Sequence, residues 1–446
     1  MKKNIGYIIK LKRLENKLTQ EELGEGICTP SYLSRIENNH VIPDESIFNL
    51  LIERLDIPII KEEVNNVDIN KRLENWHNNM LERKHFEENV YRLKDLVEQV
   101  GNEKCTIKFN IVYSRYLLMN GKTNKASEIL FNIGNIMKLE YTRNYFLYVG
   151  VLMIYYFIKG KYERAIEEGL IIINAKGLDF LGNNHEIGMF YYNLALNYSK
   201  MYQSERCIHF SNIALSIFKD NYLLDRAIDC HLLLGISFNR LNLWEKSKES
   251  YLLSEKLIKF LSEQKRNTYL GMIYNNIGYS LECQGYYMQA ITYYEKSLEH
   301  KKDVNDKVRT IINLVRSNYV DENKEKALHW LQLGIDRINN NSMSRNTVQL
   351  QIYQKLLQDD DYNYESVNQL EKTSFNYFIK NDLWQFVYEY SKLFAYMYEK
   401  QSYYKRANYM YKLAIKANEY KFSGGKKNEK SDFDLNFHDR DYLDFF

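Results

Sequence analysis

A predicted short helix near the N-terminus carries hydrogen-bonding side chains along one side. Thr29 can cap the start of this helix, and Pro30 fits its first position, where the missing N–H costs nothing. The polar side chains on the exposed side are Ser31, Tyr32, Ser34 and Arg35. Leu33 and Ile36 point the other way, toward a core. A helix-turn-helix requires this division of faces.

No residue pattern in the chain predicts catalysis. The nine histidines are dispersed without an HExxH motif, and the GGKK run at 424–427 lacks the spacing of a phosphate-binding loop. His77 and His85 are eight residues apart on one predicted hairpin and are weak candidates for metal ligands. We therefore expect no enzyme activity, no cofactor and no metal site.

The elements that would position the exposed helix lie within the first 58 residues. Thr19 and Glu22 form a capping box for a preceding helix, and a further helix is predicted over 4–17. All three prolines lie at or before Pro58, whereas the remaining 388 residues contain none. Because proline interrupts helices, we predict a small helical domain over 1–58 and a different, continuously helical architecture after it.

Composition and charge narrow the class of protein. The 446 residues exceed one ordinary core, and the formal net charge of +3 indicates no strongly charged partner. Five scattered cysteines without a CxxC pair favour a reducing compartment. Lys10 and Lys12 interrupt the N-terminal apolar run, and the longest apolar window, 145–158, is too short to span a membrane. A soluble, cytoplasmic protein is expected.

A weak repeat follows residue 70, with one anchor residue every 37 to 43 positions. The anchors are Asn89, Ala126, Ala165, Cys207, Ser247, Ala290, Ala327, Val367 and Ala407. Small residues at the anchor and twelve positions before it would let two helices approach closely, with aromatic side chains between hairpins and glycine in the turn. This spacing predicts an all-α, right-handed solenoid of about nine helical hairpins, similar to tetratricopeptide (TPR) repeats, over 71–422, with 59–70 as a linker.

Such a solenoid presents a concave groove lined by the first helix of each hairpin. Asn193, Asn276 and Asn313 share the position fourteen residues before their anchors, so their amides could pair with the backbone of an extended peptide. Polar companions predicted to face the same groove are Lys200, Asp229, Asn239, Arg240, Arg309 and Arg316. The alternative is that these side chains are solvated or bonded between neighbouring helices.

The final segment, 423–446, begins at a Gly-Gly pair and alternates acidic with aromatic residues. It could dock on the repeats, cap the last hairpin, imitate a ligand or remain disordered.

The run LTQEEL followed by GICTPSYLSRIEN resembles the Xre-type helix-turn-helix, and its short GIC turn is similar to that of the quorum-sensing regulators called RRNPP. In that family such a domain precedes TPR repeats that bind short signalling peptides. The resemblance implies that Arg35 contacts guanine, that Ser31 and Tyr32 face the major groove, and that Asn38 and Asn39 lie near the DNA backbone. It also places these residues at the DNA interface: Arg13, Gln20 and Thr29.

Three hypotheses follow from these observations. The first is a homodimeric transcription regulator that binds an inverted-repeat operator in double-stranded DNA and responds to a short peptide. The second is a TPR interaction module that sequesters a phosphorelay response regulator or stimulates its dephosphorylation. The third is a DNA-binding scaffold without a ligand. A net charge of −1 over 1–58 makes DNA binding depend on the local placement of charges and on a second copy of the domain.

Overall fold

The computed structural model describes residues 6–57, 66–84, 89–100, 102–135, 137, 142–175, 178, 182–338, 343–358 and 363–422. These residues form helices joined by short turns and include no strand, so the predicted all-α class is confirmed. By packing, the chain divides into two compact units, 1–197 and 198–446. The predicted tail, 423–446, and His85 lie outside the described residues.

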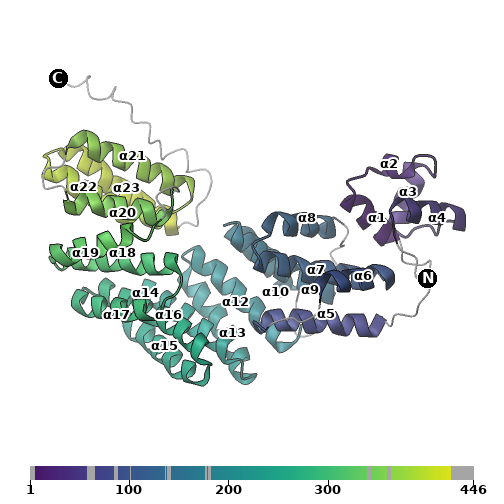
Figure 1. Ribbon diagram of the computed structural model, residues 1–446, viewed down its shortest axis with the longest axis horizontal. Coiled ribbons are helices and arrows are strands. Elements are labelled where there is room, and N and C mark those ends of the chain that lie inside the picture. The colour runs from purple at the N-terminus through teal and green to yellow at the C-terminus, as the bar shows by residue number, and fades with distance from the viewer. Residues whose placement is uncertain are drawn as a thin grey trace. The chain divides into compact units, whose positions relative to one another are not determined.

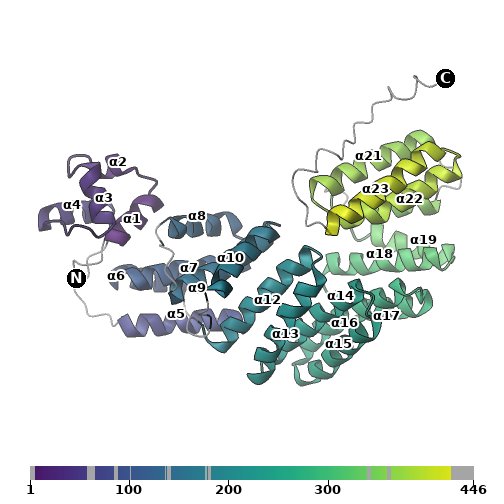
Figure 2. The ribbon, with the colours of Figure 1, turned by 180° about the vertical axis from the view of Figure 1, so that it is seen from behind.

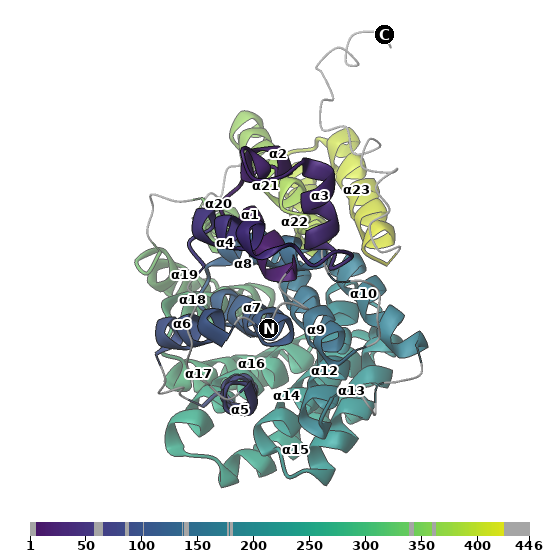
Figure 3. The same cartoon turned by 90° about the vertical axis from the view of Figure 1, so that its right-hand side faces the viewer.

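Four short helices form the N-terminal helix-turn-helix (Figures 1 and 3). They are α1 (Gly6–Glu15), α2 (Gln20–Gly24), α3 (Pro30–Glu37) and α4 (Glu45–Arg54). The predicted capping box is present, because the Glu22 amide donates to Thr19 Oγ1 at 3.1 Å and the Thr19 amide donates to Glu22 Oε2 at 2.6 Å. Leu33 and Ile36 are buried in the shared core.

Glycine lets α1 and α3 pack very closely. A Cβ atom at Gly6 would lie 2.0 Å from the carbonyl oxygen of Ile36. Gly26, between α2 and α3, has a φ of +69°, a value that L side chains rarely adopt. These two positions explain how three helices fit into so short a stretch of chain.

The repeat region consists of antiparallel helix pairs, visible side by side within each unit in Figures 1 and 2. The first unit continues with α5 (Asn66–Leu81), α6 (Val90–Val100), α7 (Glu103–Met119), α8 (Thr123–Gly134), α9 (Arg143–Ile158) and α10 (Tyr162–Asn174), and α12 (Asn184–Lys200) crosses into the second. The helix α5 begins inside the range predicted as a linker, and α1 packs against α7, so packing groups the helix-turn-helix with the first repeats.

The second unit contains the remaining hairpins. Its helices are α13 (Ser204–Asp220), α14 (Leu224–Arg240), α15 (Trp244–Leu257), α16 (Glu263–Cys283), α17 (Tyr287–His300), α18 (Val304–Val320), α19 (Lys324–Ile335), α20 (Arg345–Gln358), α21 (Tyr364–Lys380), α22 (Trp384–Lys400) and α23 (Tyr404–Phe422). A short 3-10 turn, η2 (Ile258–Phe260), follows α15. The first helices of successive hairpins contact one another: α14 contacts α16, α16 contacts α18, and α18 contacts α20.

The predicted repeat anchors are buried with one exception. Eight of them, from Ala126 to Ala407, are buried on the second helices of their hairpins. Close approach occurs as expected, since a Cβ atom at Gly278 would lie 2.8 Å from the Tyr294 ring, and Gly285 has a φ of +84° in the turn. The anchor at Asn89 is wrong: this residue is exposed, and its Oδ1 accepts a hydrogen bond from the Tyr91 amide at the start of α6. The Asn89 side chain therefore caps the start of α6 and does not pack between helices.

Among the described residues, no helix is long and apolar enough to cross a membrane.

Candidate functional site

The exposed face of α3 presents two side chains that the fold does not use. Ser31 and Arg35 are exposed, and the described structure records no hydrogen bond or ion pair for either side chain. Tyr32 is half-buried and packs against the core of the helix-turn-helix. The hydroxyl and the guanidinium on this face can therefore bond to an external partner without breaking an internal contact.

Three other residues predicted at the DNA interface contribute to the local structure. Thr29 Oγ1 accepts from the Tyr32 amide at 3.3 Å and caps α3. Asn38 Nδ2 donates to the Ser34 carbonyl at 2.8 Å, while Asn39 Oδ1 accepts from the Gly6 amide at 3.1 Å. All three side chains remain exposed, so they border the free face of α3.

Arg13 is buried, and its predicted position at the DNA interface is wrong. Its Nε donates to Glu37 Oε1 at 2.6 Å, and its second terminal nitrogen donates to Glu37 Oε2 at 3.1 Å. Gln20 Nε2 also donates to Glu37 Oε2, at 2.7 Å. Glu37 is itself buried, so a buried carboxylate holds α1, α2 and α3 together and uses the hydrogen-bonding groups of Arg13.

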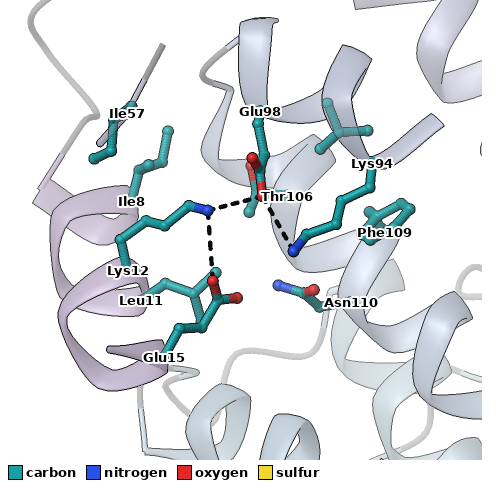
Figure 4. A pocket seen from close by; sticks show the side chains of 11 residues that line it. Ile8, Leu11, Lys12, Glu15, Ile57, Lys94, Glu98, Thr106, Phe109 and Asn110 are labelled. Carbon is teal, nitrogen blue, oxygen red and sulfur yellow. Dashed lines mark hydrogen bonds and ion pairs between the residues drawn. The ribbon is translucent and has the colours of Figure 1, made fainter. Parts of the chain in front are cut away.

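Lys12 on α1 is neutralised by contacts with the first repeats (Figure 4). Lys12 Nζ lies 2.8 Å from Glu98 Oε1 on α6 and 3.6 Å from Glu15. Lys94 Nζ lies 3.4 Å from the same Glu98 oxygen. Burial alone would lower the pKa of Lys12, but the carboxylates of Glu98 and Glu15 raise it, so this lysine stays charged.

In the second unit, Asn276 and Asn313 lie on the neighbouring helices α16 and α18 and differ in their contacts. Asn276 is half-buried, and the described structure records no hydrogen bond for its amide. Asn313 Oδ1 accepts from an Arg316 terminal nitrogen at 3.1 Å. Arg316 also donates to Glu282, at 2.9 Å through the same nitrogen. Of these residues, Asn276 has the amide that is free to bond to a ligand.

Two residues predicted to line the groove are packed between helices instead. Asp229 is buried, and its carboxylate accepts from Tyr269 Oη at 2.9 Å and from Arg226 at 3.4 Å. Asn239 is also buried, and its Oδ1 has no hydrogen-bond partner among the described residues. Both predictions fail because α14 is covered by neighbouring helices on most of its surface.

The other predicted cations of the second unit are exposed. Arg240 donates to the Ser199 carbonyl at 2.6 Å and lies over the Tyr202 ring at 4.5 Å. Arg309 pairs with Asp306 one turn earlier on α18. Lys200 is exposed, yet the surrounding protein and the positive charges of Arg240, Arg345 and Arg309 lower its pKa. Arg345 belongs to this group although it was not predicted. Arg345 lies on α20, about two helical turns before the position fourteen residues ahead of the Val367 anchor, and this helical spacing is the signal that would have found it.

Asn193 lies in the first unit, beside a buried ionic network. A small pocket there is lined by Asn193, Arg115, His77 and Glu186 among apolar side chains. His77 Nε2 lies 3.2 Å from Glu186 Oε1, and Arg143 donates to both Glu186 oxygens at 2.8 Å. Burial would raise the pKa of Glu186, but the neighbouring His77 and the hydrogen bonds from Arg143 lower it to about 2. Burial lowers the pKa of His77. No grouping of histidine, cysteine or acidic side chains among the described residues could hold a metal ion.

Comparison with known proteins agrees with this architecture. A helix-turn-helix family model matches residues 9–61. The transcriptional activator NprA of Geobacillus stearothermophilus is 27% identical over 408 residues, covering 88% of this chain and 98% of NprA. Both matches agree with the resemblance to RRNPP-type regulators.

Solved structures share the fold of this chain. A Rap protein complexed with competence and sporulation factor has a TM-score of 0.64 at 14% identity, covering 81% of this chain and 100% of the Rap chain. The quorum sensor NprR from B. thuringiensis in its apo form has a TM-score of 0.60 at 19% identity, and the match covers 79% of this chain and 99% of the NprR chain. NprR in complex with its cognate peptide NprX has a TM-score of 0.57 at 20% identity, and the match covers 78% of this chain and 99% of the NprR chain. The helix-turn-helix model and NprA describe a DNA-binding fold and an activator of transcription, not an enzyme family.

Proposed function

We propose that this chain is a cytoplasmic quorum-sensing transcription regulator that binds DNA through α3 and a short signalling peptide through its repeats. The observation that carries the proposal is the free, exposed pair Ser31 and Arg35 on a helix held rigidly by the buried Arg13–Glu37 pair. The similarity to the activator NprA supports a role in transcription.

DNA recognition would follow from the geometry of α3. Arg35 presents a planar guanidinium that can donate two hydrogen bonds to guanine, and Ser31 offers a hydroxyl one turn earlier. Thr29, Asn38 and Asn39 border this face and would lie near the phosphates. Because the domain is small and its charge is near zero, two copies in a homodimer would bind an inverted-repeat operator.

Peptide recognition would use the first helices of the repeats. The free amide of Asn276 can both donate and accept, which matches the backbone of an extended peptide. NprR, which shares the fold, has been solved with a cognate peptide. Peptide binding would alter the pairing of the helix-turn-helix domains and so control the affinity for DNA.

A binding experiment on Arg35 tests the DNA-binding part. Operator sequences are first selected from random double-stranded DNA with the wild-type chain, and affinity is then measured by fluorescence anisotropy. Arg35→Ala should weaken binding by about 10- to 100-fold, because a bidentate guanine contact contributes ~1–3 kcal/mol. The matched control is Arg92→Ala, an exposed arginine on α6, which should bind as the wild type does. Equal affinity of the wild type and Arg35→Ala would contradict the assigned contact.

A second experiment tests the role of Asn276. Peptides recovered from a random heptapeptide library by the full chain serve as probes in calorimetry. Asn276→Ala should lower their affinity by about fivefold to tenfold, since one hydrogen-bonded backbone contact is worth ~1 kcal/mol. Asn124→Ala, at an exposed position on α8, is the control. Unchanged affinity of the Asn276 variant would place the peptide elsewhere.

The fold shared with a Rap protein supports a second candidate function. In this function the chain is a TPR module that binds a phosphorelay response regulator and sequesters it or promotes its dephosphorylation. Purified response regulators would then bind the repeats equally well in the wild type and in Arg35→Ala. Sequence-specific DNA binding that depends on Arg35 favours the first function.

A further inference from the structure

Five positively charged side chains form a cluster in the second unit. This cationic cluster consists of Lys200, Arg240, Lys301, Arg309 and Arg345. Its members come from the last residues of α12 and α14, the residue after α17, the first two turns of α18 and the start of α20. Contacts place these residues together: Arg240 bonds to Ser199, the residue before Lys200, and Lys301 bonds to Thr310, the residue after Arg309. The helices α14, α16, α18 and α20 contact one another in that order, so residues up to 145 positions apart in the sequence lie on neighbouring helices.

Three members of the cationic cluster have only neutral partners. Arg240 bonds to Ser199 and stacks on an aromatic ring, and Arg345 lies over the Phe386 ring at 5.4 Å. Lys301 Nζ donates to Asn275 Oδ1 at 3.2 Å and to Thr310 Oγ1 at 2.5 Å. Within the part of the chain that the structure describes, none of these three cations has a carboxylate at ion-pair distance. Arg309 has one acidic partner, Asp306.

Three other arginines of the described residues are each paired with a carboxylate. Arg316, two turns after Arg309 on α18, is paired with Glu282, and Arg406 is paired with Glu371. Arg13 is paired with Glu37 in the helix-turn-helix. Arg240, Lys301 and Arg345 differ from these three arginines, because no described carboxylate lies at ion-pair distance from them.

The cluster members repel one another. Burial, and then the charge of Arg309, lowers the pKa of Lys301 to about 8, and the same two causes lower the pKa of Arg345. Like charges without counter-charges destabilise a fold. A bound anion would remove this repulsion, so the cluster favours binding of an anionic ligand. Guanidinium groups suit a carboxylate in particular, because two parallel hydrogen bonds can form.

We propose that the cationic cluster binds a carboxylate of the signalling peptide, so that this regulator selects acidic peptides. The inference rests on the proposed function. The free amide of Asn276 lies on α16, between α14, which carries Arg240, and α18, which carries Arg309. A peptide whose backbone is held at Asn276 would therefore bring a carboxylate between the two helices. That carboxylate belongs either to an aspartate or glutamate side chain or to the C-terminus of the peptide.

Affinity selection with the full chain tests the inference. Two random heptapeptide libraries are used, one with free C-terminal carboxylates and one with C-terminal amides, and the recovered peptides are identified by mass spectrometry. An acidic side chain as the bound group predicts enrichment of aspartate and glutamate by at least about fivefold in both libraries. A C-terminal carboxylate predicts recovery from the free-acid library alone.

Matched variants assign the effect to the cluster. Arg309→Gln replaces an exposed cluster member and should reduce the acidic enrichment, or the preference for free acids, to less than about twofold. Arg345→Gln should act in the same way and provides a second variant. Arg337→Gln, at an exposed arginine just after α19 whose side chain donates to the Leu333 carbonyl, should select peptides as the wild type does.

The failing outcomes are distinguishable. Recovery of peptides from both libraries without acidic enrichment overturns this inference and leaves the proposed peptide binding intact. Enrichment that persists in Arg309→Gln and Arg345→Gln overturns the assignment to the cluster. If neither library yields bound peptides, the proposed function and this inference both fail.

Discussion

Arg13 and Glu37 form a buried, two-pronged ion pair, with donor–acceptor distances of 2.6 and 3.1 Å, that joins α1 to the end of α3. The Glu37 side chain is fully buried, and Gln20 donates the third hydrogen bond to its carboxylate. This pair holds the end of α3 in a fixed orientation against α1. The orientation of Arg35 on the opposite, exposed face therefore depends on a residue that makes no external contact.

We predict that Arg13→Ala destabilises the helix-turn-helix by about 3–5 kcal/mol, because a buried carboxylate would lose its charged partner. Hydrogen exchange on the full chain should show faster exchange in α1 and α3. The double variant Arg13→Met with Glu37→Leu should recover most of the protection, since no unpaired charge remains. Wild-type exchange in Arg13→Ala would show that the pair does not hold these helices.

The buried carboxylate of Glu186 should make the first unit sensitive to acid. Its pKa in the fold, about 2, lies below the ordinary value of 4.5, so its stabilising contribution is complete above pH 4.5 and is lost as the pH falls toward 2. The shift corresponds to at most about 3 kcal/mol. Thermal unfolding at a series of pH values should show this loss in the wild type.

The matched variant for this prediction is Glu186→Gln. This variant should be less stable than the wild type at pH 7, because Arg143 loses one of its two acidic partners. The difference in stability between the two proteins should become smaller below pH 4. Parallel pH profiles of the two proteins would contradict the assignment to Glu186.

Two glycines in helices should respond in opposite ways to a methyl group. A Cβ atom at Gly235 would lie 2.4 Å from the buried ring of Tyr251, so Gly235→Ala should cost about 1–3 kcal/mol by overpacking. No heavy atom outside the local helix backbone lies within 4 Å of a Cβ atom at Gly150, and Gly150→Ala should gain about 0.5–1 kcal/mol through helix propensity. Urea unfolding measures both changes, and destabilisation by both variants would refute the contrast.

Local sequence signals predicted much of the fold. The capping box at Thr19 and Glu22, the cap at Thr29 and the alternation of Leu33 and Ile36 with polar residues depend on contacts a few residues apart, and the structure contains all of them. The repeat spacing likewise predicted the hairpins, because small residues at each anchor and twelve positions before it let the two helices of a hairpin contact each other closely. Gly278 and Tyr294 show this contact.

The candidate sites depended on contacts that the sequence does not display. Arg13 and Arg35 look equivalent in the sequence of the N-terminal domain, but the ion-pair partner of Arg13 is 24 residues away in the sequence. Asp229 and Asn239 were predicted on the groove face, yet α14 is enclosed on most sides, so helical periodicity alone could not identify its exposed strip. The sequence by itself thus determined the helices and their pairing, because these follow from local periodicity and short-range packing. Only the tertiary structure decided which charges are neutralised inside the fold and which remain clustered, because each ion pair depends on residues that distant helices bring together.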